Sequence, residues 1–251
     1  MSKRDLPVSE YDKFGDFCYN KVQEGDPAKE QTVVAILSML GDVADVKICD
    51  LACGEGFFSR LLAARGAQVT GIDLSANLLA HARRQSTEMP IRYLLDDAQQ
   101  LTSVPDGSFD IVICNMALMD IEDLTATFHT VNRISAGGGL FFFGILHPCF
   151  VTPFNTKDPQ IEQDAEGNFV AKRVSQYSQE GKWYSDGTGF CGTLGSIHRK
   201  LSTYLNELAQ AGFSIQEVSE PLLPPGSYQT AKEQWRSTVP AFLVVQSRKV
   251  A

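Results

Sequence analysis

The sequence contains no run of eighteen uninterrupted apolar residues and no excess of basic residues. The first absence excludes an ordinary transmembrane helix, which needs about twenty predominantly apolar residues. Residues 1–12 also lack the apolar segment of a secretory signal peptide. Lysine and arginine number 22 against 30 aspartates and glutamates, so the net charge is −8 and a generic nucleic-acid binder is disfavoured. We therefore expect a cytoplasmic protein that binds neither a membrane nor nucleic acid.

The six cysteines contain no C-x-x-C pair. A disulfide-stapled miniprotein is excluded, because 251 residues are enough to bury a substantial core. Cys49 and Cys114 lie inside apolar runs, where a thiol behaves as a small hydrophobic side chain. With 43% apolar and 21% charged residues, the composition is that of a globular domain, and we expect its cysteines to be reduced.

Strand-like and helix-like segments alternate from about residue 26 to residue 146, which is the pattern of a parallel sheet with crossover helices. The strand-like runs are 46–51, 68–72, 91–95, 109–114 and 140–146. A helical pattern at 201–209 and two more strand-like runs, 213–218 and 241–245, follow later. A proline-rich link between these last two runs can carry the final strand antiparallel to its neighbours.

Residues 148–197 differ in character from the rest of the chain. They hold many glycines and aromatic side chains with little periodicity, so we interpret them as an insertion that covers a substrate site. The sequence thus predicts a single domain, with a core formed by 26–147 and 198–251 and with residues 1–25 as an N-terminal addition. It carries no signal for a particular oligomeric state.

A glycine turn follows the first strand-like run. Gly54 and Gly56 lie where a strand gives way to a helix, and glycine there lets a ligand approach the backbone. Asp73 lies nineteen residues beyond Gly54 at the end of the second strand, where an acid can bind ribose hydroxyls. These features predict a nucleoside ligand.

Two nucleoside classes fit such a turn, a nicotinamide or flavin dinucleotide and S-adenosylmethionine. The dinucleotide fingerprint expects a third glycine where this sequence has Ser59, and it gives no role to the acid Asp50 beside the phosphates. A sulfonium with an ammonium group instead benefits from Asp50 or Glu55 nearby. The charges favour the sulfonium, and an NAD(P)-dependent oxidoreductase is the alternative.

Residues 48–56, Ile-Cys-Asp-Leu-Ala-Cys-Gly-Glu-Gly, resemble the first motif of the class I S-adenosylmethionine-dependent methyltransferases, although Ala52 stands where that family most often has glycine. Further segments resemble the family in the same order: 71–75 the ribose-binding strand end, Asp97-Ala98 the adenine contact, 108–115 the fourth strand and 137–143 the turn into the fifth. The resemblance covers about residues 46–146 and resumes from 198 to the end.

The resemblance implies an α/β fold of Rossmann type, with helices on both faces of a seven-stranded sheet of order 3-2-1-4-5-7-6 and strand seven antiparallel. It implies S-adenosylmethionine as cofactor and S-adenosylhomocysteine as product. The residues that it assigns to cofactor binding are Asp50, Ala52, Gly54 and Gly56 around the methionine end, Asp73 on the ribose, Leu74 and Asp97-Ala98 on adenine, and Asn115 with Met116 on the methionine side.

Methyl transfer requires mainly that the nucleophile be held in line with an already activated carbon, so a base is needed only when the acceptor begins as an alcohol, phenol or ammonium. His147 ends the fifth strand, and His198 precedes the returning helix at a position that resembles one beside the pocket in family members with a similar insertion. Both are candidate catalytic bases. The alternative for each is a hydrogen-bonded structural histidine.

Aromatic side chains are the candidates for acceptor contacts. Tyr11, Phe14 and Tyr19 lie in residues 1–25, which resemble the family's N-terminal lid segment, and Trp183 and Tyr184 lie in the insertion. Ordinary packing is the alternative for both groups. The histidines and cysteines that flank the insertion do not have the spacing of zinc ligands, so we expect no metal.

Together these features predict a methyltransferase that transfers a methyl group from S-adenosylmethionine to an N or O atom of a small-molecule acceptor. Besides the oxidoreductase, two alternatives stay open: a protein methyltransferase and a cofactor-binding protein of the same fold without catalytic activity.

Overall fold

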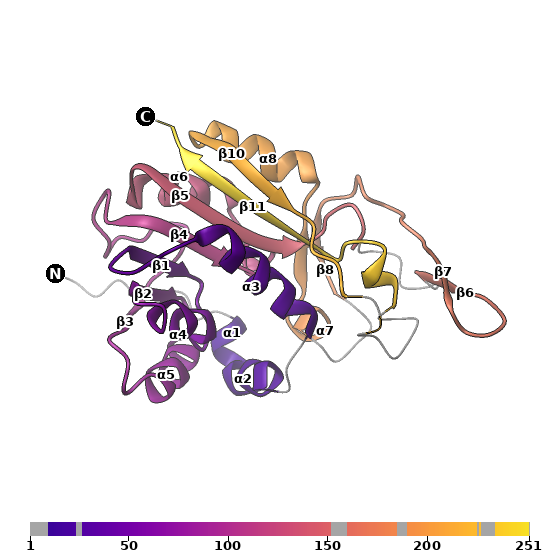
Figure 1. Ribbon diagram of the computed structural model, residues 1–251, viewed down its shortest axis with the longest axis horizontal. Coiled ribbons are helices and arrows are strands. Elements are labelled where there is room, and N and C mark those ends of the chain that lie inside the picture. Colours follow the sequence, from indigo (N-terminus) through magenta and orange to yellow (C-terminus); the bar gives the residue numbers. More distant parts are fainter. Residues whose placement is uncertain are drawn as a thin grey trace.

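The computed structural model describes residues 10–23, 27–151, 160–184, 190–224, 226 and 234–250. Its centre is a seven-stranded sheet of order β10-β11-β5-β4-β1-β2-β3 (Figure 1). The strands are β1 (Lys47–Leu51), β2 (Gln68–Asp73), β3 (Arg92–Leu95), β4 (Phe109–Asn115), β5 (Ser135–Leu146), β10 (Phe213–Ser219) and β11 (Phe242–Lys249). The five strands β1 to β5 pair in parallel, and β11 pairs antiparallel with both β5 and β10. The predicted strand order and the antiparallel last strand are confirmed.

Helices cover both faces of this sheet. They are α3 (Pro27–Leu40), α4 (Phe57–Ala63), α5 (Ala76–Gln85), α6 (Leu124–Ile134) and α8 (Leu201–Gln210). Apolar side chains of α3 and α4 form one core with the sheet, and those of α6 and α8 form a second core on the opposite face. None of the described helices is long and apolar enough to cross a membrane.

The middle strand β4 shows why the sheet is buried on both sides. Successive side chains of a strand point to opposite faces. Ile111 and Ile113 pack into the core of α3 and α4, whereas Val112 and Cys114 pack into the core of α6 and α8. The nearly continuous apolar run therefore marks a strand with no wet face, as the sequence predicts.

The N-terminal ends of the crossover helices are fixed by polar side chains. Ser75 accepts a hydrogen bond from the backbone of Leu78 at the start of α5, and Asp123 accepts one from Ala126 at the start of α6. Such caps satisfy backbone groups that a helix start leaves open. They also fix where each strand-to-helix loop passes the carboxyl edge of the sheet.

The fifth strand begins earlier than its sequence pattern predicts. The glycines 137–139 lie inside β5, which starts at Ser135, and the pairing with β4 shifts register between Phe109 and Ile111. Gly138 has a φ of 72°, which glycine adopts without strain. The glycines therefore bend a strand already paired with β4 and do not precede it.

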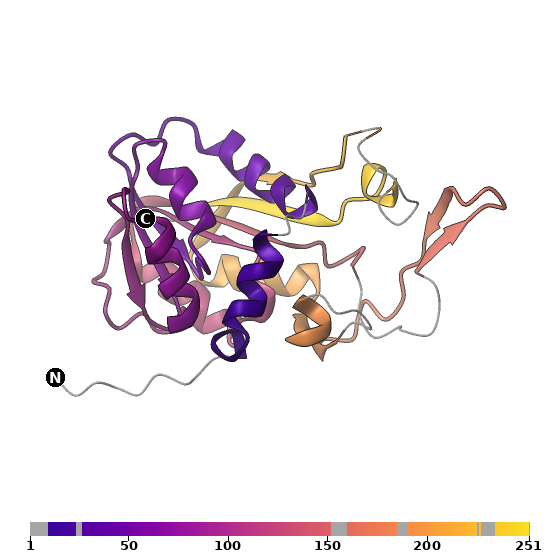
Figure 2. The same ribbon diagram turned by 90° about the horizontal axis from the view of Figure 1, so that it is seen from below.

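The segments outside the sheet lie beyond its carboxyl edge. The N-terminal helices are α1 (Glu10–Lys13) and α2 (Gly15–Gln23), and both contact α5. The insertion contains β6 (Ile161–Gln163), β7 (Phe169–Lys172), β8 (Gly181–Trp183), α7 (Phe190–Thr193) and β9 (Ser196–His198). Figure 2 shows the hairpin of β6 and β7 projecting away from the sheet, past the end of β5.

Candidate active site

The turn between β1 and α4 passes through three residues with positive φ: Ala52 (55°), Gly54 (55°) and Gly56 (79°). Positive φ is strained for alanine but not for glycine. A Cβ on Gly56 would collide with the hydroxyl of Tyr93, so packing requires this glycine. A Cβ on Gly54 would meet no described atom within 4 Å, and the backbone there faces space that a ligand can use.

Asp73 lies beside this turn at the end of β2. Its Oδ2 accepts a hydrogen bond from Gly54 N at 2.8 Å, and its Oδ1 accepts one from Ser75 N, also at 2.8 Å. Burial raises the pKa of Asp73, while these backbone N–H groups oppose that increase. Leu74 next to it is half-buried. The predicted proximity of the turn and this acid is present, and each carboxylate oxygen keeps a second lone pair for a ligand hydroxyl.

Three carboxyl groups surround the turn. Asp50 is 2% exposed, and Ser59 Oγ donates to its Oδ2 at 2.5 Å. Burial raises the pKa of Asp50 to about 7, and the charges of Asp73 and Glu55 add to the increase. Glu55 is also buried and pairs with Arg60 at 2.8 Å. This environment favours a cation and opposes a pyrophosphate.

Asp97 and Ala98 follow β3 on the same edge. Asp97 is buried, and its carboxylate accepts hydrogen bonds from the backbone and side-chain amides of Gln99. Ala98 is half-buried against the core of α6 and α8. Both residues therefore lie at the end of a strand next to β2, where the resemblance assigns the adenine contact.

Asn115 is the last residue of β4, and Met116 follows it. The Asp50–Ile113 pairing of β1 with β4 places Asn115 level with Ala52 of the glycine turn. Met116 has a φ of 56°, and its N–H donates to Gly144 O at 2.7 Å. A strained residue held in this way at a strand end is typical of a functional site.

The N-terminal segment is joined to the loops of this edge. Tyr11 donates from its hydroxyl to Asp120 Oδ2 at 2.7 Å, across the end of β4. Asp12 Oδ1 accepts from Ser75 Oγ at 3.0 Å and from Asn77 N at 2.9 Å, at the start of α5. Because Ser75 also bonds Asp73, α1 lies beside the residues that the resemblance assigns to the ribose.

The other predicted acceptor aromatics lie in different environments. Phe14 is 39% exposed, and Tyr19 stacks on His81 of α5 with ring centroids 4.1 Å apart. Trp183 lines a pocket beneath the insertion, whereas Tyr184 is 53% exposed. Of this set, Tyr11 bonds a loop of the carboxyl edge, and Trp183 lines a pocket together with residues of that edge.

His147 has both ring nitrogens in hydrogen bonds. Cys149 N donates to its Nδ1 at 3.2 Å, so the neutral ring carries its proton on Nε2 and donates it to Glu220 Oε1 at 2.7 Å. The residue is 2% exposed. This arrangement ties the end of β5 to the link between β10 and β11.

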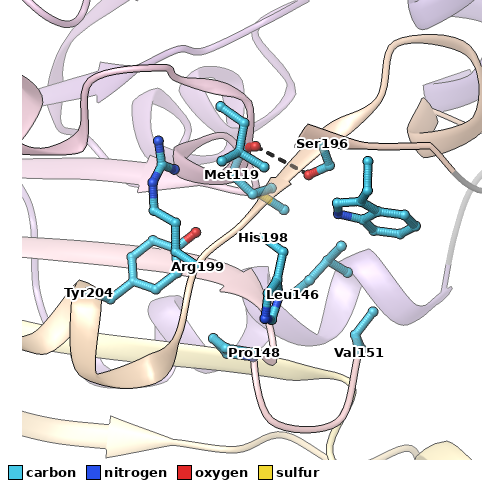
Figure 3. Close-up of a pocket in the computed structure, with 10 residues that line it drawn as sticks. Met119, Leu146, Pro148, Val151, Ser196, His198, Arg199 and Tyr204 are labelled. Carbon is cyan, nitrogen blue, oxygen red and sulfur yellow. Dashed lines mark hydrogen bonds between the residues drawn. The ribbon is translucent and has the colours of Figure 1, made fainter. Parts of the chain in front are cut away.

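His198 faces the pocket beneath the insertion, as Figure 3 shows. The pocket is lined by Met119, Leu146, Pro148, Val151, Trp183, Ser196, Ile197, His198, Arg199 and Tyr204. His198 Nε2 lies 2.9 Å from the carbonyl oxygen of Tyr177, so Nε2 carries a proton that it donates. In a neutral ring this bond leaves the lone pair on Nδ1.

Three residues of this edge were missed at the sequence level: Asp120, Arg199 and Glu220. The buried guanidinium of Arg199 donates to the carbonyl oxygens of residues 118, 121 and 122, at 2.7 to 2.9 Å. The sequence feature that could have indicated Arg199 is its position directly after the candidate His198. A charged residue in a buried segment needs hydrogen-bond partners.

No group of three or more His, Cys, Asp or Glu in the described part of the chain could hold a metal ion. The side chain of Cys191, at the far end of the insertion, lies outside the described residues.

Comparisons with known proteins give the same class as the turn and its acids. The methyltransferase domain family matches residues 49–143. A solved S-adenosylmethionine-dependent methyltransferase of Mesorhizobium loti is 32% identical, with a TM-score of 0.72, over 90% of this chain and 99% of that one. An uncharacterised protein of Haemophilus influenzae is 26% identical over 97% of this chain and 98% of its own. The ubiquinone biosynthesis O-methyltransferase of Xanthomonas oryzae is 34% identical over 42% of this chain and 45% of its own length.

The fold and site define an S-adenosylmethionine-dependent methyltransferase. This chain belongs to the class I family of these enzymes, and its cofactor is S-adenosylmethionine. The residues present fit that group, because Glu55 Oε1 and Asn115 Oδ1 are buried at the turn without a hydrogen-bond partner in the described chain. Both are acceptors suited to a cationic ligand. The oxidoreductase alternative is not supported.

Proposed function

We propose that this methyltransferase acts on an N or O atom of a small molecule. The observation that carries the proposal is that two other segments of the chain bond to η1 (Leu118–Asp120), the short helix that follows β4, and so cover it. Tyr11 of α1 bonds Asp120, and Ser196 of β9 donates to Met119 O at 3.2 Å. A macromolecular acceptor would have to displace both covering segments, whereas a small acceptor can be enclosed by them. The similarity to a ubiquinone biosynthesis O-methyltransferase supports the same class.

The acceptor site is proposed to include the pocket beneath the insertion. Its volume is about 20 Å³, enough for a water molecule or two. An organic acceptor therefore requires the insertion to move outward and close again over it. Residues 1–25 and 148–197 would then act as the lid and exclude water from the reaction.

When bound, S-adenosylmethionine supplies a methyl group on a positively charged sulfur. The chain binds and orients it: we assign Asp73 to the ribose, Leu74, Asp97 and Ala98 to adenine, and the turn with Asn115 and Met116 to the methionine end. The three carboxyl groups of the turn stabilise positive charge on the ligand.

For an acceptor that must lose a proton, we propose His198 as the base. It lines the acceptor pocket, and the bond from Nε2 to Tyr177 O holds its ring there. His147 is proposed as a positioning residue, because both of its nitrogens bond to the chain.

The test is incubation with methyl-labelled cofactor and two fractions of a cell extract, small metabolites and macromolecules, followed by identification of the labelled product by mass. Label is expected in a small molecule, on N or O. His198→Asn should slow its formation at least tenfold while the affinity for S-adenosylhomocysteine stays within twofold. Label in protein or nucleic acid alone would contradict the proposed acceptor class.

A further inference from the structure

Two amide side chains near the carboxyl edge, one buried and one half-buried, hold buried polar atoms that are unsatisfied among the described residues. Gln31 Oε1, Gln31 Nε2 and Asn115 Oδ1 have no hydrogen-bond partner among the residues that the structure describes. Gln31 is only 9% exposed. Burying a carboxamide without satisfying its donor or its acceptor costs free energy, and such groups in native proteins usually meet a ligand or a bound water.

The two amides belong to segments that meet over β5. A Cβ on Gly144 would collide with Asn115 Oδ1 and would lie 3.2 Å from Thr32 Cβ, so both side chains cover this glycine. Gln31 precedes Thr32 on α3. The N-terminal end of α3 lies at the carboxyl edge, because Leu40 at its other end leads to the start of β1 (Figure 1). Helical side chains lean toward the helix N-terminus, which carries the Gln31 amide toward that edge.

The strand register connects this place with the glycine turn. Asp50 pairs with Ile113, so Asn115, two residues further along β4, is level with Ala52. Asn115 in turn pairs with Gly144 of β5. A ligand that leaves the turn in the direction of β5 therefore passes Asn115 first and reaches the start of α3 next.

The ligand end that fits here must offer both hydrogen-bond donors and acceptors. An α-amino acid does so, since its ammonium group only donates and its carboxylate only accepts. We propose that Gln31 binds the amino-acid end of S-adenosylmethionine together with Asn115. Gln31 Nε2 donates to the carboxylate, and Gln31 Oε1 and Asn115 Oδ1 accept from the ammonium group. This assignment rests on the cofactor alone and is independent of the acceptor.

The test compares two ligands that differ only in that end. S-adenosylhomocysteine carries the amino acid, whereas 5′-methylthioadenosine has the same nucleoside and thioether without it. Titration calorimetry of Gln31→Leu should show S-adenosylhomocysteine binding weakened about tenfold or more, because hydrogen bonds to charged groups are lost. The affinity for 5′-methylthioadenosine should stay within twofold of the parent protein.

Thermal unfolding without ligand gives a second readout. Leucine removes a buried amide that has no partner in the described part of the chain, so Gln31→Leu should unfold at the same temperature or a higher one. Ser38→Ala is the matched control on α3, since Ser38 Oγ donates within the helix, to Ala35 O at 2.7 Å, and it should change neither affinity. Unchanged S-adenosylhomocysteine binding in Gln31→Leu would overturn the proposal. The Gln31 amide would then be available to bind the methyl acceptor instead. An equal loss with both ligands would also overturn it, as general damage to the site.

Discussion

At the scale of single residues, Asp50 connects burial with cofactor charge. Burial raises its pKa to about 7, and hydrogen bonds from the side chain and the backbone of Ser59 oppose that increase. The group is thus mainly protonated below that pH and charged above it. A cationic ligand favours the charged form, so binding releases protons. We predict that the affinity for S-adenosylmethionine rises between about pH 6 and pH 8, measured by titration calorimetry in buffers of different ionisation enthalpy.

Two variants separate Asp50 from other titrating groups. Asp50→Asn cannot ionise, and its affinity should be lower and nearly flat across the same range. Ser59→Ala removes a hydrogen bond that stabilises the charged carboxylate, so the midpoint should move to higher pH. A slope that persists in Asp50→Asn would assign the pH dependence to another residue.

The positions of the glycine turn and of the strand ends were predictable because they depend on short stretches of chain. Gly54 needs its positive φ, and Asp73 follows directly from where β2 ends. The missed partners are separated widely in sequence. Asp120 meets Tyr11 across 109 residues, and Glu220 meets His147 across 73. No local pattern encodes such pairs, since only the assembled sheet brings them together.

At the scale of elements, too, local patterns were predictable and long-range contacts were not. The strands of the sheet repeat an apolar pattern that burial on both faces imposes, so their order and type could be inferred. The hairpins of the insertion are only three or four residues long per strand and show no such period. Their pairing depends on contacts such as Phe169 N donating to Gln234 Oε1 at 3.0 Å, which sequence spacing does not reveal.

Arg199 is the residue that holds two of these elements together. Its guanidinium satisfies three carbonyl oxygens in residues 118–122, just before α6, while its backbone follows β9. Arg199→Met would leave these carbonyls without their donor. The expected loss is about 2–4 kcal/mol in the free energy of unfolding, since each buried group left unsatisfied costs roughly 1–3 kcal/mol and water can reach part of this site. Urea denaturation measures it.

A second arginine variant serves as the control. Arg173→Met removes an ion pair with Glu162 in which both side chains are more than 40% exposed. Exposed pairs contribute about 0–1 kcal/mol, so this variant should be nearly as stable as the parent protein. If Arg199→Met were equally mild, the guanidinium would not be what joins β9 to the loop after β4.

At the scale of the whole molecule, charge acts over longer distances than any of these contacts. The chain carries a net charge of −8, and three carboxyl groups, Asp50, Glu55 and Asp73, surround the turn to which we assign the cofactor. S-adenosylmethionine has one net positive charge, from its sulfonium, ammonium and carboxylate groups, whereas S-adenosylhomocysteine has none. The field of the protein should therefore accelerate the encounter with the first ligand and leave the second unaffected.

Salt separates this effect from local contacts. The Debye length falls from about 30 Å at 0.01 M to about 8 Å at 0.15 M ionic strength, so long-range attraction is screened over this range while buried contacts are not. The association rate of S-adenosylmethionine, followed by stopped-flow tryptophan fluorescence, should fall about two- to fivefold relative to that of S-adenosylhomocysteine. Parallel salt dependence of the two rates would show that the acidic charge of this chain does not steer its cofactor, and that the carboxyl groups at the turn act only after contact.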